Sequence, residues 1–246
     1  MGLRYQESYE VPFYETDVNH HMKLPQLLSL ALQVSGHQSY QLGISDEVIF
    51  ERYGLVWVIT DYHIDIERLP YYGETITIET DPVSYNRLFC YRYFYIYDEN
   101  HTKIMTIFAT FVLMDFNTRK VHPVVEDIVK SYESDKIKKA IRGPRYSALE
   151  LAEETLYHLR YFDLDMNGHV NNSKYIEWMF EVLDLDFLTR YIPKTLDLKY
   201  VKEIHYGQDI VSSVKKEDLT TRHEIVIGDT VHAQAIIHWQ DKKETR

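Results

Sequence analysis

The chain has 246 residues, of which 45% are hydrophobic and 26% charged, a composition that fits one large globular domain or two domains of about 120 residues. Its formal net charge of −11 argues against nucleic acid and anionic membranes as partners, because their phosphates repel an acidic protein. The single cysteine, Cys90, excludes an intrachain disulfide. With no signal-like start and no apolar run of membrane length, we expect a cytoplasmic protein that does not enter membranes.

The N-terminal half is predicted to contain one helix followed by an antiparallel sheet. Pro25 favours a helix start, since its missing N–H has no partner in a first turn, and Gly43 favours the end. The apolar positions on one helix face are Leu27, Leu28, Ala31 and Val34. Predicted strands cover Leu55–Arg68, Gly73–Tyr85, Arg87–Asp98 and Lys103–Phe116. A hairpin turn at Asp98–His101 joins the last two.

A linker and a second helix follow. Val129–Ser147 has no strand pattern and contains Gly143-Pro144, which predicts a linker that is partly helical. Asn172 is a suitable N-cap for the second helix. Its apolar stripe is Ile176, Met179, Phe180, Leu183 and Phe187.

Two short motifs recur along the chain and indicate an internal duplication. Asp17-Val18-Asn19-His20-His21 matches Asp165-Met166-Asn167-Gly168-His169, 148 residues later, and each motif directly precedes a predicted helix. Tyr72-Gly73-Glu74-Thr75-Ile76 similarly resembles Tyr206-Gly207-Gln208-Asp209-Ile210. Chance alone is the alternative explanation. Because three polar identities share one structural context, we predict two copies of an α+β unit, each with one helix on one antiparallel sheet.

The second copy of the motif is the candidate site. If the stretch is extended, alternate spacing points Asp165, Asn167 and His169 to one side, beside the N-terminus of a helix. That end carries partial positive charge and free N–H groups, which suit a developing oxyanion. Asp-x-Asn-Gly is also a good turn sequence, so a purely structural role is the alternative.

Residues 165–178 resemble the signature of the plant and bacterial acyl-ACP thioesterases, a D-x-N-x-H-V-N-N-x-x-Y-x-x-W stretch. The resemblance extends over essentially the whole chain. It implies an α+β fold of two tandem hotdog units, each a long helix wrapped by a curved antiparallel sheet. The expected division is an N-terminal unit at residues 1–128, a linker at 129–150 and a catalytic C-terminal unit at 151–246. The N-terminal unit is then expected to hold the acyl chain with its helix and the strands around Phe89–Tyr97.

The resemblance also implies a fourth catalytic residue. The family has a glutamate in a Tyr-x-x-Glu segment, which here is Tyr200-Val201-Lys202-Glu203. Many plant members have a cysteine directly after it, where this chain has Ile204, so the resemblance excludes a covalent cysteine mechanism. Without the resemblance, Glu203 would be interpreted as a solvated strand carboxylate. In the first copy the matching position is Leu69, so that copy is predicted to be degenerate.

These observations together predict an enzyme that hydrolyses fatty acyl thioesters on acyl carrier protein and releases free fatty acid. Glu203 is the candidate general base for water, with Asp165, Asn167 and His169 binding water or the thioester. The expected partner is acyl carrier protein with its acylated 4′-phosphopantetheine. No cofactor or metal is expected, since the histidines lack ligand-like spacing. A tandem pair can act as a monomer, and a homodimer is the alternative.

Two other functions remain open. An acyl-CoA thioesterase would share the chemistry but would need a site for the nucleotide phosphates, and the sequence identifies none. A non-catalytic acyl-binding module would keep the pocket but could lack Glu203 or His169, which are both present. The linker Val129–Ser147 has six basic and two acidic residues, so it is either a carrier-docking surface or a solvated connection.

Overall fold

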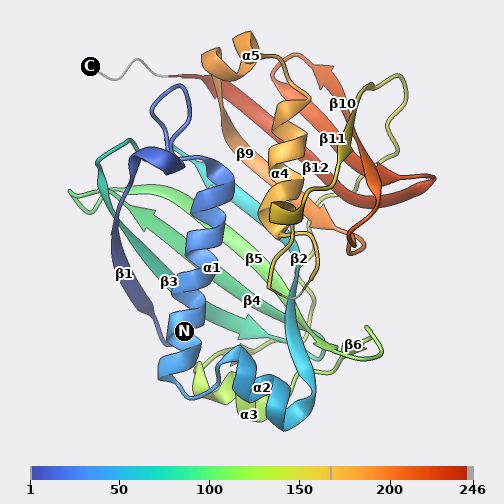
Figure 1. Ribbon diagram of the computed structural model, residues 1–246. Coiled ribbons are helices and arrows are strands. Elements are labelled where there is room, and N and C mark those ends of the chain that lie inside the picture. The colour runs from blue at the N-terminus through green and yellow to red at the C-terminus, as the bar shows by residue number, and fades with distance from the viewer. Residues whose placement is uncertain (1, 167, 243–246) are drawn as a thin grey trace.

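The computed structural model describes residues 2–166 and 168–242, and the chain forms two units with the same order of elements (Figure 1). The first unit contains β1 (Tyr5–Glu10), α1 (Leu24–Gln41), α2 (Asp46–Tyr53), β2 (Leu55–Ile66), β3 (Thr75–Tyr85), β4 (Phe89–Tyr97) and β5 (Lys103–Asp115). The connection that follows contains β6 (Val121–His122), α3 (Glu126–Ser131) and β7 (Asp135–Lys136). The second unit contains β8 (Glu153–His158), α4 (Asn172–Glu181), α5 (Leu185–Arg190), β9 (Tyr191–Tyr200), β10 (Asp209–Glu217), β11 (Thr220–Ile227) and β12 (Thr230–Asp241). The predicted strands and the duplication are thereby confirmed.

All main strands belong to one sheet that runs through both units. Its order is β1-β3-β4-β5-β2-β9-β12-β11-β10-β8, so the second half repeats the first in reverse. The two halves join where β2 pairs antiparallel with β9, with Ile64 opposite Leu196. Both side chains are fully buried, and burying each contributes about 1.5–3 kcal/mol. The sequence predicted two sheets, and this central pairing makes them one.

Helix α1 begins and ends as the sequence predicts. Pro25 lies in its first turn, and Gly43 follows the helix with a positive φ of 70°, a conformation that glycine adopts without a Cβ clash. The predicted apolar face is buried at Leu27, Leu28, Ala31 and Val34. Figure 1 shows α1 crossing the strands of the first unit and α4 those of the second, and the two helices contact each other.

Helix α4 is shorter than the sequence predicts. Its N-cap is Asn171, one residue before the predicted one, and the Asn171 side chain accepts a hydrogen bond from the Ser173 N–H. The helix ends at Glu181, because Asp184 caps a new helix, α5, by accepting from the Phe187 N–H at 2.7 Å. The predicted continuous stripe through Phe187 is therefore wrong, since Phe187 belongs to α5.

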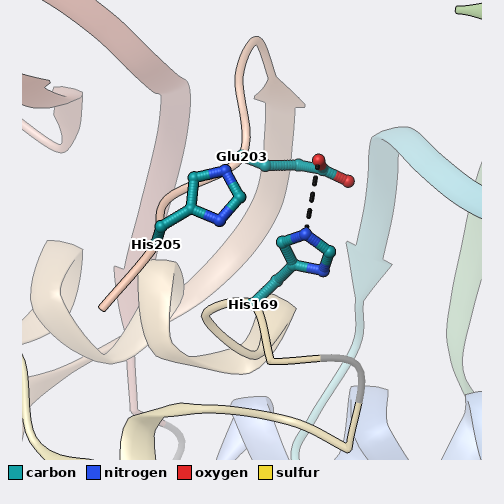
Figure 2. Close-up of side chains that lie close together, drawn as sticks. All are labelled: His169, Glu203 and His205. Atoms are coloured by element: carbon teal, nitrogen blue, oxygen red, sulfur yellow. Dashed lines mark ion pairs between the residues drawn. The ribbon is translucent and has the colours of Figure 1, made fainter. Parts of the chain in front are cut away.

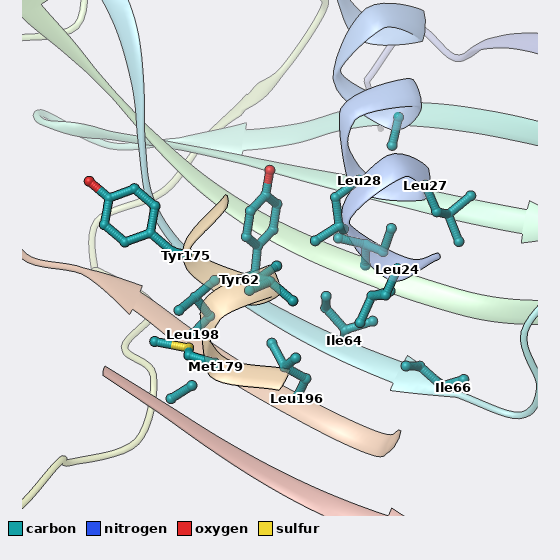
Figure 3. Packing of buried hydrophobic residues seen from close by; sticks show 14 of the residues in the cluster. Leu24, Leu27, Leu28, Tyr62, Ile64, Ile66, Tyr175, Met179, Leu196 and Leu198 are labelled. Atoms are coloured by element: carbon teal, nitrogen blue, oxygen red, sulfur yellow. The ribbon is translucent and has the colours of Figure 1, made fainter. Parts of the chain in front are cut away.

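One hydrophobic core serves both units. Figure 3 shows residues of α1 and β2 packed with residues of α4 and β9 in the same cluster. A smaller cluster around α2 and α3 contains Ile49, Leu113 and Ile128. From residue 137 to residue 152 the chain forms neither helix nor strand, and α3 supplies the helical part of the predicted linker. Among helices of the described residues, none is both long and apolar enough to span a bilayer.

Candidate active site

The segment from Asp165 to His169 is a tight turn. The Asp165 N–H donates to the His169 carbonyl at 2.8 Å, and the Gly168 N–H donates to the Asp165 carbonyl at 3.0 Å. Gly168 has a φ of 78°, as the turn interpretation of Asp-x-Asn-Gly requires. The expectation of an extended stretch with three side chains on one side is therefore wrong. The turn still delivers His169 to the site, and Asn167 lies outside the described residues.

Backbone bonds hold the turn against the segment that carries Glu203. His169 forms an antiparallel bridge with His205, and the Val170 N–H donates to the Ile204 carbonyl at 3.1 Å. The N–H of Val201 donates to the His232 carbonyl on β12 at 2.8 Å, which fixes the start of that segment. Two pieces of chain that are distant in sequence thus place their side chains face to face.

His169 and Glu203 meet at this junction, as Figure 2 shows. The His169 Nε2 atom lies 3.7 Å from the Glu203 Oε2 atom, and the His205 ring centroid lies 5.0 Å from that of His169. Both members of the pair are partly exposed, His169 at 21% and Glu203 at 30% of the side chain. At this distance one water molecule beside the pair can hydrogen-bond to both the imidazole and the carboxylate.

An arginine that the sequence did not single out binds Glu203. Arg119 lies in the turn after β5 of the first unit, and its Nε donates to Glu203 Oε2 at 3.1 Å. Its Nη2 donates to the other carboxylate oxygen, Oε1. The guanidinium therefore engages both oxygens of the carboxylate from the opposite unit.

A cavity of about 700 Å³, within the size range of small-molecule sites, is bordered by His169, Glu203 and Arg119. Residues of the second unit in its wall include Asp165, His169, Asn172, Tyr200 and Glu203. Residues of the first unit include Leu32, Trp57, Cys90, Arg92, Phe111 and Met114. Both units therefore build the cavity, and the second one carries the candidate catalytic groups.

The expected acyl-binding elements line this cavity only in part. From the predicted strand region Phe89–Tyr97 it is Cys90, Tyr91 and Arg92 that reach the cavity. The wall from α1 comes from Leu32 to Ser39, because the predicted apolar face is used in the core. Burial raises the pKa of the Cys90 thiol to about 12, which disfavours the thiolate that a nucleophile needs.

Arg92 is a buried cation in the cavity wall. Its Nη1 donates to Gln38 Oε1 and to Thr80 Oγ1, both at 2.7 Å, and its guanidinium lies 5.0 Å from the Tyr132 ring centroid. Burial lowers its pKa. Neither its position nor its burial could be predicted from the sequence, where Arg92 is one charge in an aromatic strand.

The start of α4 borders the same cavity. Asn172 lies in the cavity wall, while the N–H groups of Ser173 and Lys174 donate to Asn171. The first residue of α4 therefore brings the positive end of the helix dipole to the cavity wall. The Tyr200 hydroxyl donates to the Asn172 carbonyl at 2.9 Å and fixes this end against β9.

Histidine and carboxylate groups that could bind a metal also gather here. His169, Glu203 and His205 offer one ligand atom each, all within 4.8 Å of one another. Their sequence spacing gave no sign of this cluster, because the turn and the segment after β9 approach only in the fold. Since Arg119 already engages both carboxylate oxygens, we interpret the group as a charge cluster around Glu203.

The first copy of the motif lacks this chemistry. His21 is buried, burial lowers its pKa, and its ring centroid lies 4.8 Å from that of Tyr71. His21 forms its bridge with Tyr71, as His169 does with His205. The residue of the first copy that is equivalent to Glu203 is therefore Leu69. Leu69 is buried in the core, and the predicted loss of the second carboxylate in this copy is confirmed.

Two family models match the chain: the acyl-ACP thioesterase N-terminal domain over residues 2–132 and the C-terminal domain over residues 146–241. Among curated relatives, a chloroplastic oleoyl-acyl carrier protein thioesterase of Coriandrum sativum is 26% identical over 98% of this chain and 70% of that protein. The corresponding thioesterase 1 of Arabidopsis thaliana is 27% identical over 91% of this chain and 66% of that protein. The chain thus spans about two thirds of the length of these plant relatives.

Solved structures show the same fold. A Lactobacillus plantarum protein, provisionally named an oleoyl thioesterase, superposes with a TM-score of 0.93 at 31% identity, over 99% of this chain and 98% of that one. The 12:0-ACP thioesterase of Umbellularia californica superposes with a TM-score of 0.86 at 19% identity, over 98% and 99%. The predicted tandem hotdog fold is confirmed by these likenesses.

Proposed function

The chain belongs to the acyl-ACP thioesterase family, and we propose that it hydrolyses the thioester between a fatty acyl chain and the phosphopantetheine of acyl carrier protein. The free fatty acid is the product, as in fatty acid biosynthesis. One observation carries the proposal: the pair of His169 and Glu203, 3.7 Å apart, lies at the border of a cavity that both units line.

Glu203 is the proposed general base. It takes a proton from a water molecule that hydrogen-bonds to its carboxylate and to His169, and the water oxygen attacks the thioester carbonyl carbon. The C–S bond of the tetrahedral intermediate then breaks, and the pantetheine sulfur leaves as a thiol with the proton that Glu203 took from the water. His169 Nε2 faces Glu203 and positions the water, while Asp165 holds the His169 backbone through its Oδ1 atom at 3.3 Å.

The start of α4 is the proposed binding site for the oxyanion of the tetrahedral intermediate. Asn172 lines the cavity there, and the helix N-terminus carries partial positive charge. Asn167, from the same sequence motif, is the further proposed hydrogen-bond donor to the thioester or the water. This assignment rests on the motif.

The first unit is proposed to hold the acyl chain. Trp57, Phe111 and Met114 supply apolar surface in the cavity, which suits an alkyl chain. The division at residues 128 and 150 is kept as a proposal. The chain contains both units of one active site, so a monomer is sufficient, and the cytoplasm is the proposed location.

The carrier protein is the proposed partner. Residues 129–147 border the cavity through Val129, Tyr132 and Ser134 and carry an excess of basic residues, which suits an acidic partner. Lys130 and Lys136 pair with Asp127 and Glu126, which reduces the charge that this segment offers. Reversing the charge of the remaining lysines in this segment distinguishes its two interpretations. If the segment is a docking surface, we expect the KM for acylated carrier protein to rise. If it is a solvated connection, we expect KM to stay unchanged.

The test is hydrolysis of a matched panel of acyl carrier protein and acyl-CoA thioesters of medium and long chain length, followed by release of free thiol. We expect fast release from the carrier and slow release from CoA. Fast turnover of CoA substrates alone would assign the chain to acyl-CoA hydrolysis. Binding without turnover would make it an acyl-binding module.

A further inference from the structure

Arg119 crosses from the acyl-holding unit to the proposed catalytic carboxylate. Its Nε and Nη2 atoms donate to the two oxygens of Glu203, a residue 84 positions later in the chain. Side-chain exposure is 31% for Arg119 and 30% for Glu203, so the pair is neither free in solvent nor sealed in the core. A two-point contact of this kind fixes the plane of the carboxylate as well as its place.

The turn that carries Arg119 is itself ordered. Asp115 Oδ1 accepts from the N–H groups of Asn117 and Thr118 at 3.2 and 2.7 Å, and the Arg119 N–H donates to the Asp115 carbonyl at 3.0 Å. Arg119 has a φ of 53°, in the left-handed region that a non-glycine residue enters at a cost. The turn therefore presents this side chain in a defined direction.

The same turn also borders the cavity. Met114, Phe116 and Val121 lie before and after Arg119 in the chain, and all of them line the cavity wall. The guanidinium is thus attached to the wall that is proposed to hold the acyl chain. An exposed ion pair contributes little to stability, about 0–1 kcal/mol, so stability alone gives a weak reason for this arrangement.

We propose that Arg119 is a positioning residue for Glu203: it holds the carboxylate oriented toward His169, and it links the acyl-holding unit to the reacting end of the site. The proposal rests on the proposed thioester hydrolysis. It places one residue that orients the catalytic carboxylate in the N-terminal unit, so the second unit alone would have an incomplete site.

The activity test compares three variants. Arg119→Lys keeps the charge but loses the two-point contact, whereas Arg119→Asn removes the charge and keeps a residue that tolerates a positive φ. Lys120→Asn is the matched control, because it removes one positive charge from the same turn at an exposed position. Each is measured for kcat and KM on acyl carrier protein substrate.

For Arg119→Asn we expect kcat to fall about 10- to 100-fold with KM nearly unchanged, since a misplaced catalytic group affects the chemical step. Arg119→Lys should restore part of kcat. Lys120→Asn should match the wild type. Equal kcat in Arg119→Asn would overturn the proposal while leaving hydrolysis by the wild type intact.

A second measurement needs no substrate. The melting temperatures of Arg119→Asn, Glu203→Gln and the double variant form a double-mutant cycle. We expect the double variant to lose less than the sum of the single losses, because the second change removes a partner that is already unpaired. Strict additivity would show that the pair does not form in solution and would sink the proposal. Lack of hydrolysis by the wild type would refute the proposed function instead, a result that the cycle does not depend on.

Discussion

The two copies of the D-x-N-x-H motif make the same backbone hydrogen bonds but have different roles. In both, the aspartate N–H donates to the histidine carbonyl at 2.8 Å. The histidine ring then meets an aromatic or imidazole ring at an interplanar angle of 56° in each copy. What differs is the neighbouring segment, which carries Glu203 in the second copy but Leu69 at the matching position in the first. Turn geometry is therefore insufficient for chemistry, and the residue on the facing segment decides it.

The first copy has a structural role of its own. Asn19 Nδ2 donates to the Leu188 carbonyl at 3.0 Å, and Lys242 Nζ donates to Asn19 Oδ1 at 2.9 Å. Both partners belong to the second unit. The polar side chain of this turn thus joins the two units, at a place where the other copy borders the cavity.

Glu203→Gln is the most direct test of the proposal that the facing residue makes the second copy catalytic. The variant keeps the shape of the side chain but removes the proposed base, so we expect kcat to fall about 10²- to 10⁴-fold. Glu67→Gln, at an exposed position near the first copy, is the control and should retain wild-type activity. Steady-state hydrolysis of acyl carrier protein substrate measures both. Full kcat in Glu203→Gln would refute the base assignment.

Matched histidine variants test whether the copies divide activity and stability. His169→Gln should reduce kcat about 10²-fold with a small change in melting temperature, because the side chain is partly exposed. His21→Gln should leave kcat intact but lower the melting temperature, since it places an amide in a site that is 2% exposed. Activity and thermal unfolding are measured on both proteins. A loss of kcat in His21→Gln with the fold intact would show that the first copy takes part in the reaction.

The sequence predicted the duplication because its signals are local: the motif, the following helix and the later Gly73 and Gly207 turns lie in the same order. The sequence also predicts that Leu69 replaces the carboxylate in the first copy, because aligning Gly73 with Gly207 matches Leu69 to Glu203. Arg119 could not be predicted, because its partner is 84 residues away and the pairing of β2 with β9 brings the units together. Alternate spacing alone does not distinguish an extended stretch from a turn, so the sequence does not predict the turn at Asp165.

The two units should also differ in their response to acid. Burial lowers the pKa of His223 on β11 from 6.5 to about 3, and it lowers that of His21 as well. An unfolded chain takes up a proton near pH 6.5, so the stability from a neutral buried histidine is complete above that pH. It is lost as pH falls from 6.5 toward 3, by about 1.4 kcal/mol per pH unit for His223.

His223→Leu should therefore flatten the dependence of the urea midpoint on pH between 7 and about 5. His21→Leu should flatten it less, because charges near His21 differ in sign: Asp17 opposes the effect of burial. His238, an exposed histidine on β12, provides the control as His238→Gln. An unchanged slope in His223→Leu would mean that this histidine is not the acid-sensitive group.

The smallest expected effect concerns the joint between the units. Asn19→Ala removes the hydrogen bonds to the Leu188 carbonyl and from Lys242, and both are partly exposed to solvent. We expect a loss of about 1 kcal/mol in the free energy of unfolding with kcat unchanged. Asn167→Ala, the matched change in the second copy, should instead lower kcat and affect stability less. Urea unfolding and steady-state hydrolysis, measured on both variants, separate the two roles. If Asn19→Ala lowered kcat as much as Asn167→Ala does, the first turn would be transmitting strain to the site, and the division between a joint and a catalytic turn would be wrong.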